Sequence, residues 1–383
     1  MQPAVAEEIR RIAAGPIDWE YLLNEAADQS VTPLLCRQLS SIAGDILDAA
    51  RMQRLKDLMR AHAMRTLVLT AELIAILNQF RSANIQAIPY KGPVLAAQAY
   101  GDVALREFED LDIVLRQRDM AKANDIVVAL GYRPKYPWIL STDANASLVP
   151  GEYNYRDVPR HLMVELHTER TLRHFPVPPD LDDLASRLVA VSVGGHDVHT
   201  FAPEDMLVLL CIHGAKDFWE RLSWIADVAE FVQAYPRLDW DRCLHRAASL
   251  HAQRMLDLGL ALAVRFYGPA LPVDFLARVR ADAAVEEVAA QVERRLLMRT
   301  RVELGGAGRF HFRRHMLGGA LAGWRYSFRL ATVPSEDDWS MVKLPNALAP
   351  LYVALRPLRL LRKYGVSDEA APREAIAAKK TSN

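Results

Sequence analysis

Two carboxylates stand two residues apart at the start of an apolar, strand-like run. Asp110 and Asp112 lie within residues 106–115, which read Arg-Glu-Phe-Glu-Asp-Leu-Asp-Ile-Val-Leu. In an extended strand, residues i and i+2 point to the same face, so the pair directs four oxygens at one place. Such a charge requires a cation or water, and hard oxygen ligands suit Mg²⁺ or Mn²⁺. The spacing therefore predicts a divalent metal site.

A possible phosphate-binding turn precedes this pair. Lys91 and Gly92 follow the short apolar run 85–90, and Pro93 comes next. Lysine supplies positive charge, glycine lets a phosphate approach the backbone, and a helix starting at Pro93 offers its N-terminus. A plain strand-to-helix turn with the lysine in solvent explains the same residues, and the residues alone leave both interpretations open.

A third carboxylate follows the pair in another strand-like run. Alternation over residues 161–167 places Met163, Glu165 and His167 on one face. In metal-assisted phosphoryl transfer, carboxylates hold two cations that flank the transferred phosphorus. We expect Glu165 to complete the metal site and to help remove the proton of an acceptor hydroxyl. His167 is expected to support these ligands or to contact the substrate, unless it is an ordinary strand histidine.

These motifs resemble a known family. Lys91-Gly92, Arg106 and Asp110-Leu-Asp112 are similar to the uncharacterised nucleotidyltransferase family of the polymerase-β-like superfamily. The resemblance extends from about residue 60 to Arg356-Pro357, and its specific part is these motifs. Later residues that fit the same pattern are Glu165, His167, His213, Lys216, Trp219, Arg221, Trp224 and Asp227.

The resemblance implies a reaction and a set of binding residues. A nucleoside triphosphate, with ATP expected, would bind its phosphates at Lys91, Gly92 and Arg106. Mg²⁺ or Mn²⁺ on the three carboxylates would activate an acceptor hydroxyl for attack on the α-phosphorus, with release of pyrophosphate. The acceptor could be a small molecule, a sugar, a peptide or a protein. From the residues alone, Arg106 could instead be a surface arginine or an ion-pair partner of Asp110 or Asp112.

A second polar group follows a continuously apolar stretch. Residues 207–212 must be buried, and His213, Lys216 and Asp217 then share one helical side at spacings i, i+3 and i+4. These side chains could form the wall of a cleft for nucleotide or acceptor. A buried helix end with a lysine that reaches solvent is the competing interpretation. We expect His213 and Lys216 to contact the nucleotide, while Asp227 pairs with Lys216 or an arginine.

Other activities remain compatible with these motifs. A kinase-like variant would use the same metals but release ADP. A metal-dependent glycosyltransferase also uses Asp-x-Asp, although it calls for a longer nucleotide-binding domain before the motif. A non-catalytic binding module would keep the fold. Pro93, which offers no hydroxyl to a triphosphate, favours the module, whereas the three carboxylates favour catalysis.

Composition limits the possible partners. The 383 residues are 51% hydrophobic and 25% charged, with a formal net charge of zero. A neutral chain has no general attraction to nucleic acid or anionic membranes, so stable nucleic-acid binding is not expected. Residues 301–383 carry fourteen Lys or Arg against seven Asp or Glu, and this basic segment is either a solvated surface or an anion-binding patch.

The cysteines and the apolar runs bear on localisation. Cys36, Cys211 and Cys243 show no paired spacing, which argues against a disulfide framework or a zinc site. No secretory signal is recognisable at the N-terminus, and no charge-free apolar run is long enough to span a bilayer. These features predict a cytoplasmic protein without a transmembrane segment.

The hydrophobic periodicity predicts an α+β fold with a small mixed sheet flanked by helical regions. We expect a helical region over 1–84, a polymerase-β-like core over 85–202 and a helical domain over 203–383. A long helix over 46–80, single or broken near Thr66, should pack beside the sheet. The strand-like runs are 86–90, 111–115, 153–156, 161–167, and 189–193 paired with 197–201 as a hairpin.

Overall fold

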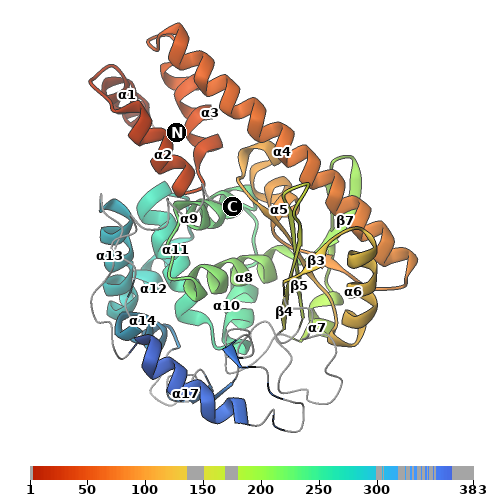
Figure 1. The fold of residues 1–383 in the computed structure, drawn as a ribbon. Coiled ribbons are helices and arrows are strands. Elements are labelled where there is room, and N and C mark those ends of the chain that lie inside the picture. Colours follow the sequence, from red (N-terminus) through yellow and green to blue (C-terminus); the bar gives the residue numbers. More distant parts are fainter. Residues whose placement is uncertain are drawn as a thin grey trace.

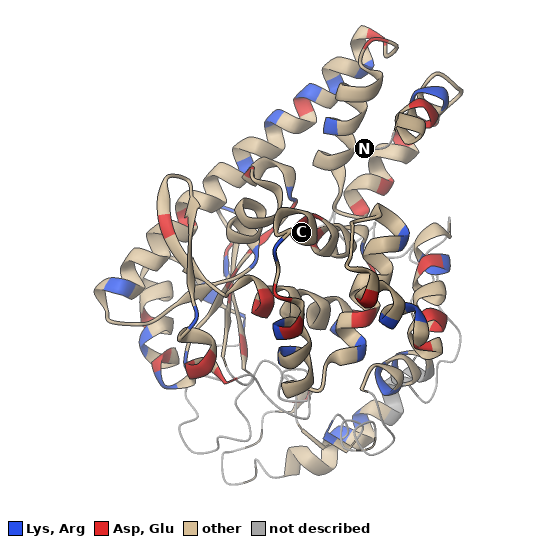
Figure 2. Cartoon of the chain, turned by 180° about the vertical axis from the view of Figure 1, so that it is seen from behind, with Lys and Arg blue, Asp and Glu red and all other residues tan. Residues whose placement is uncertain are grey.

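Helices surround a small mixed sheet in the computed structural model of the protein (Figure 1). The structure describes residues 3–135, 151–168 and 180–298 and, with gaps, residues 304–364. Basic and acidic residues are interspersed along the outer helices (Figure 2), in keeping with the net charge of zero.

The N-terminal helices pack beside one half of a long helix. Asp18 accepts a hydrogen bond from the Tyr21 backbone N–H at 3.0 Å and so caps the second helix. Asp48 caps the long helix in the same way through Arg51, at 2.7 Å. The four helices are α1 (Pro3–Ala13), α2 (Trp19–Asp28), α3 (Thr32–Ala43) and α4 (Ala49–Ser82).

Helix α4 is continuous and joins the N-terminal helices to the sheet. Its buried stripe of Leu69, Leu73, Ile76 and Phe80 recurs every three or four residues and packs in one core with the sheet. By length and composition alone this helix could also cross a membrane, and 39% of its most apolar window is buried in the fold. Burial of the stripe against the sheet is typical of a core helix of a globular protein.

The main sheet has the strand order β1-β2-β5-β4-β3. Strands β2 and β5 are parallel, and the other neighbouring pairs are antiparallel, which makes the sheet mixed as predicted. The strands are β1 (Ile88–Pro89), β2 (Asp110–Val114), β3 (Arg133–Pro134), β4 (Glu152–Asp157) and β5 (Leu162–His167).

Alternation along β2 and β5 gives the sheet two different faces. Leu111 and Ile113 of β2 share a buried core with Val164 and Leu166 of β5. Helix α4 and helix α6 (Met120–Ala129) contribute to the same core. Because side chains alternate between faces, Asp110 and Asp112 and their partners on β5 must lie on the opposite face.

A separate hairpin packs beside the sheet. Strands β6 (Val189–Val193) and β7 (His196–Thr200) are antiparallel, as predicted, although His196 belongs to the strand rather than to the turn. Gly194 and Gly195 connect them with φ of +58° and +80°, a conformation that glycine adopts without strain. The hydroxyl of Thr200 donates to the carbonyl of Pro89 at 2.7 Å and ties the hairpin to β1.

Short helical segments link the strands. The turn after β1 enters helix α5, a π-helix and a 3₁₀ helix before β2 begins. A further 3₁₀ helix precedes α6, and a short helix precedes β6. These segments are α5 (Gly92–Leu95), η1 (Ala96–Tyr100), η2 (Val103–Leu105), η3 (Gln117–Asp119) and α7 (Leu181–Ala185).

The helices between residues 203 and 316 pack around α11 (Figure 1). Helical periodicity extends over residues 207–232 and 240–267, but each stretch forms two helices, separated at 217–221 and at 250–252. The described helices are α8 (Pro203–Lys216), α9 (Leu222–Ala234), α10 (Trp240–Ser249), α11 (Gln253–Tyr267), α12 (Val273–Ala281), α13 (Ala283–Leu297), α14 (Gly306–Met316) and α17 (Leu351–Tyr364).

Candidate functional site

Strand pairing brings the predicted carboxylates together. In the parallel register of β2 and β5, Asp112 lies opposite Glu165, and Val114 lies opposite His167. Strand β4 then places Glu152 opposite His167. Residues directly opposite each other in a sheet share a face. The Asp-x-Asp run and the Glu-x-His run therefore form one polar surface, as their alternation predicted.

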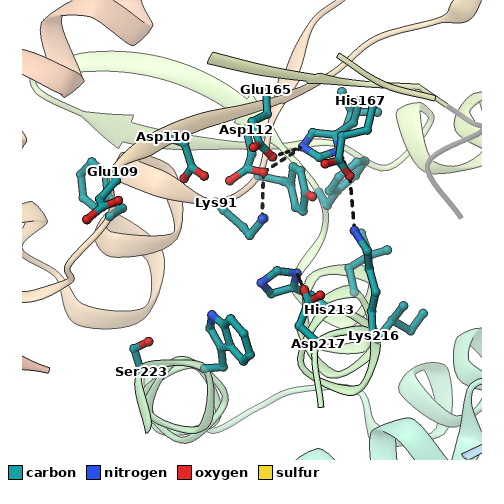
Figure 3. Close-up of a pocket in the computed structure, with 18 of the residues that line it drawn as sticks. Lys91, Glu109, Asp110, Asp112, Glu165, His167, His213, Lys216, Asp217 and Ser223 are labelled. Atoms are coloured by element: carbon teal, nitrogen blue, oxygen red, sulfur yellow. Dashed lines mark hydrogen bonds and ion pairs between the residues drawn. The ribbon is translucent and has the colours of Figure 1, made fainter. Parts of the chain in front are cut away.

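This polar surface forms one wall of a cavity of about 470 Å³ (Figure 3). Helices α8 and α9 supply the opposite wall. Every residue predicted to bind metal or nucleotide lines this cavity except Gly92, which lies in the turn beside Lys91. The predicted residues in the lining are Lys91, Arg106, Asp110, Asp112, Glu165, His167, His213 and Lys216.

Asp112 is the most tightly held carboxylate of the site. Its Oδ1 accepts hydrogen bonds from Lys91 Nζ and from His167 Nε2, each at 2.8 Å. Burial opposes ionisation of Asp112, but the charge of Lys91 and the His167 contact outweigh it and hold the pKa of this carboxyl well below its usual value. Asp112 is therefore ionised, and Lys91 is the cation that compensates it.

The neighbouring carboxyls are less well compensated. Burial and then the negative charges of Asp112 and Glu152 raise the pKa of Glu165 to about 7. Burial and then the charge of Asp112 raise the pKa of Asp110. Asp110 and Glu165 therefore resist ionisation beside the ionised Asp112. An added cation would relieve the repulsion among these three carboxyls.

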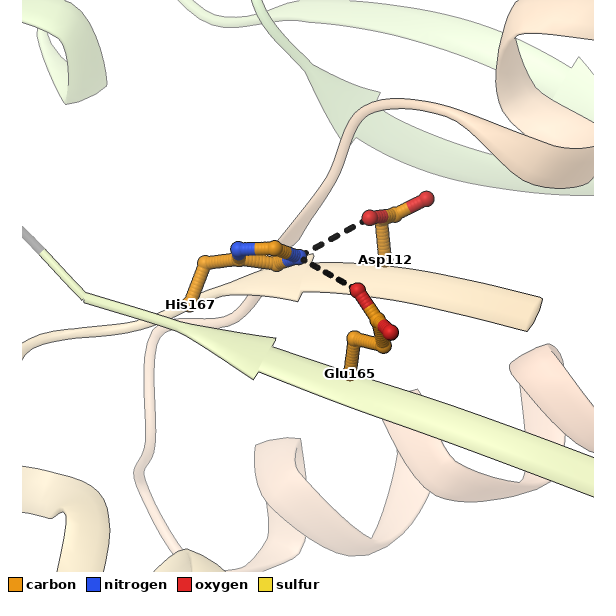
Figure 4. A group of neighbouring side chains, drawn as sticks. All are labelled: Asp112, Glu165 and His167. Atoms are coloured by element: carbon orange, nitrogen blue, oxygen red, sulfur yellow. Dashed lines mark hydrogen bonds and ion pairs between the residues drawn. The ribbon is translucent and has the colours of Figure 1, made fainter. Parts of the chain in front are cut away.

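The donor atoms also have a spacing that suits a metal ion. One ligand atom each from Asp112, Glu165 and His167 lies within 4.8 Å of the others (Figure 4). Two carboxylates and an imidazole are common metal ligands. The residues present therefore fit a divalent cation.

The Lys91-Gly92 turn depends on glycine. Gly92 has a φ of +54°, a conformation that disfavours other residues. A Cβ at this position would lie 3.3 Å from the backbone oxygen of Asp110. Glycine therefore lets the turn after β1 pack closely against the start of β2, which places Lys91 beside Asp112.

Arg106 makes a buried ion pair with a residue far from it in the sequence. Its Nε and Nη2 donate to the two carboxylate oxygens of Asp227 on α9 at 2.8 and 2.9 Å. The Tyr100 hydroxyl donates to the same carboxylate at 2.8 Å. Arg106 is thus a buried bidentate partner of Asp227, rather than a surface arginine or a partner of Asp110 or Asp112. Asp227 pairs with an arginine, one of the two partners considered for it.

Helix α8 brings the second predicted group to the opposite wall. Lys216 Nζ lies 3.3 Å from a carboxylate oxygen of Glu152, so it bridges from α8 to β4. His213 Nδ1 lies 3.4 Å from Asp217. Its ring packs edge-on against Trp224 with a centroid distance of 5.3 Å. Burial holds the pKa of His213 well below its usual value, so its imidazole is neutral at pH 7.

Comparison with known families identifies the chain's relatives. Residues 15–268 match the family described as uncharacterised nucleotidyltransferase. The chain belongs to this family. The match includes the sheet, the three carboxylates and the wall formed by α8 and α9. A comparison with curated proteins finds no match.

Several solved structures are similar to this nucleotidyltransferase-family chain. The antibiotic-resistance factor ANT(2'')-Ia in solution shares 14% identity at a TM-score of 0.34, over 48% of this chain and 91% of its own. Its crystal structure with adenylyl-2''-tobramycin shares 12% sequence identity at a TM-score of 0.34, and the match covers 49% of this chain and 98% of that one. An antigenic nucleotidyltransferase-like protein from Paracoccidioides brasiliensis shares 14% identity at a TM-score of 0.33, and the match covers 56% of this chain and 92% of that one.

Two residues that line the cavity were not among the predicted site residues. Glu152 precedes the run 153–156 that was read as a strand, and it faces both His167 and Lys216. Extending the alternation one residue back would have placed it on the polar face. Trp224 packs against the hydrophobic core and also lines the cavity beside His213. Trp219 is fully buried.

The raised pKa of Glu165 predicts a pH-dependent stability. Its pKa rises from an ordinary 4.5 to about 7 on folding, so the folded state binds more protons between these values. Stability of the metal-free protein therefore falls as the pH rises through this window. The Glu165→Gln variant does not titrate there, so we expect it to exceed the wild type by up to about 3 kcal/mol above pH 7.

Urea unfolding of the metal-free proteins at several pH values measures this difference. It should vanish below pH 4.5, where Glu165 is protonated in both states. Asp125→Asn, an exposed carboxylate on α6, is the control and should show no such trend. An equal stability of Glu165→Gln and wild type at pH 8 would contradict the inferred environment of this carboxyl.

Proposed function

We propose that this protein is a metal-dependent nucleotidyltransferase. It transfers a nucleoside monophosphate from a nucleoside triphosphate, with ATP as the expected donor, to an acceptor hydroxyl and releases pyrophosphate. The observation that carries the proposal is the convergence of Asp110, Asp112 and Glu165 on one face of β2 and β5, inside a cavity that also contains Lys91. Membership of a nucleotidyltransferase family supports this chemistry.

The three carboxylates would hold one or two divalent cations, Mg²⁺ or Mn²⁺. Bound there, a cation would acidify the acceptor hydroxyl and offset the charge that develops on the transferred phosphoryl group. Asp112 already holds the ammonium of Lys91 at 2.8 Å. A metal can take the place of this ammonium only if Lys91 moves away from Asp112. A triphosphate bound nearby would offer Lys91 a new anionic partner.

Basic groups on both walls would bind the triphosphate. Lys91 and the backbone at Gly92 contribute from the sheet side, and Lys216 and neutral His213 contribute from α8. Arg106 uses Nε and Nη2 for Asp227, which leaves Nη1 as the guanidinium nitrogen for a phosphate oxygen. The bidentate pair would fix the guanidinium plane before the nucleotide binds.

The acceptor hydroxyl would attack the α-phosphorus from the side of Glu165. A new bond forms between the acceptor oxygen and the α-phosphorus, and the bond from that phosphorus to the bridging oxygen of pyrophosphate breaks. Glu165 would accept the hydroxyl proton once the bound cation has acidified that hydroxyl. The acceptor is a small molecule, a sugar, a peptide or a protein that presents this hydroxyl.

Identification of the released product tests this proposal. The protein is incubated with each nucleoside triphosphate, Mg²⁺ or Mn²⁺ and cell extract as the acceptor source, and pyrophosphate and ADP are measured separately. We expect pyrophosphate, in an amount that falls to background without the protein. ADP in place of pyrophosphate would assign the site to a kinase-like variant. No product and no metal-dependent nucleotide binding would instead favour a non-catalytic binding module.

A further inference from the structure

His167 is placed differently from a histidine that only supports the carboxylates. Its side chain is 5% exposed, and the edge of the Tyr90 ring packs against it with a centroid distance of 5.7 Å. Nε2 is directed at the carboxylates of β2 and β5, at 2.8 Å from Asp112 Oδ1 and 3.7 Å from Glu165 Oε2 (Figure 4). The imidazole therefore lies inside the carboxylate cluster.

The other ring nitrogen of His167, Nδ1, faces a carboxylate on β4. Nδ1 of His167 lies 4.0 Å from Glu152 Oε2, and Lys216 holds the same oxygen at 3.3 Å. Histidines that bind metals commonly direct their second nitrogen at a carboxylate, which fixes the ring and selects the nitrogen that faces the ion. Glu152 lies on this side of the His167 ring, although 4.0 Å is longer than a hydrogen bond.

The distances suit a shared ion. Oxygen and nitrogen ligands lie about 2.0–2.2 Å from a divalent transition metal, so neighbouring ligand atoms are about 3 Å apart. The 2.8 Å between Asp112 Oδ1 and His167 Nε2 has this spacing. In the free protein the proton on Nε2 is donated as a hydrogen bond to Oδ1, because an ionised carboxylate only accepts. A metal would take the place of that proton.

We propose that His167 is a direct metal ligand together with Asp112 and Glu165, and that the site therefore prefers a first-row transition metal ion such as Mn²⁺ over Mg²⁺. This inference rests on the proposed nucleotidyl transfer and specifies its metal. Carboxylates alone suit Mg²⁺, whereas imidazole nitrogen suits the softer transition metals. The oxygen-nitrogen set of this cluster distinguishes it from a site made of three carboxylates.

Pulsed electron paramagnetic resonance of bound Mn²⁺ tests the ligand directly. The full-length protein is stripped of metal with a chelator and loaded with substoichiometric Mn²⁺, and the echo modulation from coupled ¹⁴N is recorded. We expect ¹⁴N modulation in the wild type and its loss in His167→Ala. The control is His213→Ala, which removes the imidazole on the opposite wall and should keep the modulation.

A second variant covers the case in which His167→Ala does not fold. His167→Asp replaces the nitrogen ligand with oxygen, and the ratio of the Mg²⁺ and Mn²⁺ dissociation constants is measured for both proteins. Mn²⁺ binds more tightly than Mg²⁺ at many sites, so the change in this ratio is the informative quantity. We expect the ratio to fall about tenfold or more in His167→Asp.

The outcomes separate this inference from the proposed function. Mn²⁺ that binds the wild type without ¹⁴N modulation, or a metal ratio unchanged in His167→Asp, would overturn the role of His167 and leave nucleotidyl transfer intact. Absence of both Mn²⁺ and Mg²⁺ binding, even with ATP present, would overturn both. Modulation lost in His167→Ala and retained in His213→Ala would establish the ligand.

Discussion

Replacing Asp110 by asparagine is expected to lower the rate of nucleotide transfer at least about a thousandfold, without loss of stability. The substitution removes one of the carboxylates that would hold the catalytic cation. Within the described part of the chain, the Asp110 carboxylate has no hydrogen-bond or ion-pair partner, and both burial and Asp112 raise its pKa. Its neutral replacement therefore relieves repulsion, and the free energy of unfolding should equal or exceed that of the wild type.

This combination separates a catalytic role from a structural one. Transfer rates and urea unfolding are measured for Asp110→Asn and for Asp125→Asn, which neutralises an exposed carboxylate of α6 on the other side of the sheet. The control should keep both its activity and its stability. Full activity in Asp110→Asn would contradict the proposed site, whereas an unfolded Asp110→Asn would contradict the inferred environment of this carboxyl.

Replacing Arg106 by methionine is expected to destabilise the protein by about 3–5 kcal/mol. Arg106 and Asp227 are almost completely buried, with side-chain exposures of 10% and 3%, and their pairing is bidentate. Removal of the guanidinium leaves the Asp227 carboxylate in the interior with the Tyr100 hydroxyl as its remaining side-chain donor. The pair joins the segment before β2 to α9, so its loss weakens the contact between the two walls.

A second substitution tests whether the uncompensated charge is the cause. In Arg106→Met/Asp227→Asn the buried charge is gone, and asparagine still accepts the Tyr100 hydrogen bond. We expect the double variant to recover most of the lost stability in urea unfolding. Nucleotide affinity should stay weak, because Arg106 is also proposed to bind phosphate. A single variant within about 1 kcal/mol of the wild type would contradict a buried pair, since exposed pairs contribute this little.

The convergence of the metal site could be predicted because strand alternation is local. Asp110 and Asp112 are two residues apart, as are Glu165 and His167, and a strand places each pair on one face. The apolar residues between them fix which face is buried. The parallel pairing of β2 with β5, which brings the two pairs together, does not follow from this local pattern. The Gly194-Gly195 turn was similarly predictable from its own residues.

Contacts between distant segments could not be predicted in this way. Arg106 and Asp227 are 121 residues apart, and Glu152 and Lys216 are 64 apart. Nothing in a local pattern selects Asp227 among the many carboxylates of the chain as the partner of Arg106. Such pairs depend on how α8 and α9 pack against the sheet, which is a property of the whole fold.

The break between α8 and α9 has the same origin. Helical periodicity runs through residues 217–221, yet Phe218 and Trp219 have positive φ. The Trp219 backbone N–H donates to the carbonyl of Gly214 at 2.8 Å, and its ring packs so closely on Gly214 that a Cβ there would lie 2.5 Å away. Burial of one indole against α8 therefore ends the helix, and tertiary packing overrides the local preference.

Transfer of radiolabel from ATP most directly tests nucleotidyl transfer at this site. The protein and an Asp110→Ala/Asp112→Ala variant are incubated with α-³²P or γ-³²P ATP, Mg²⁺ or Mn²⁺ and cell extract. We expect the α-label on an acceptor with the wild type and no labelled acceptor with the variant. A γ-label on the acceptor, or an α-label that persists in the variant, would contradict nucleotidyl transfer by these carboxylates.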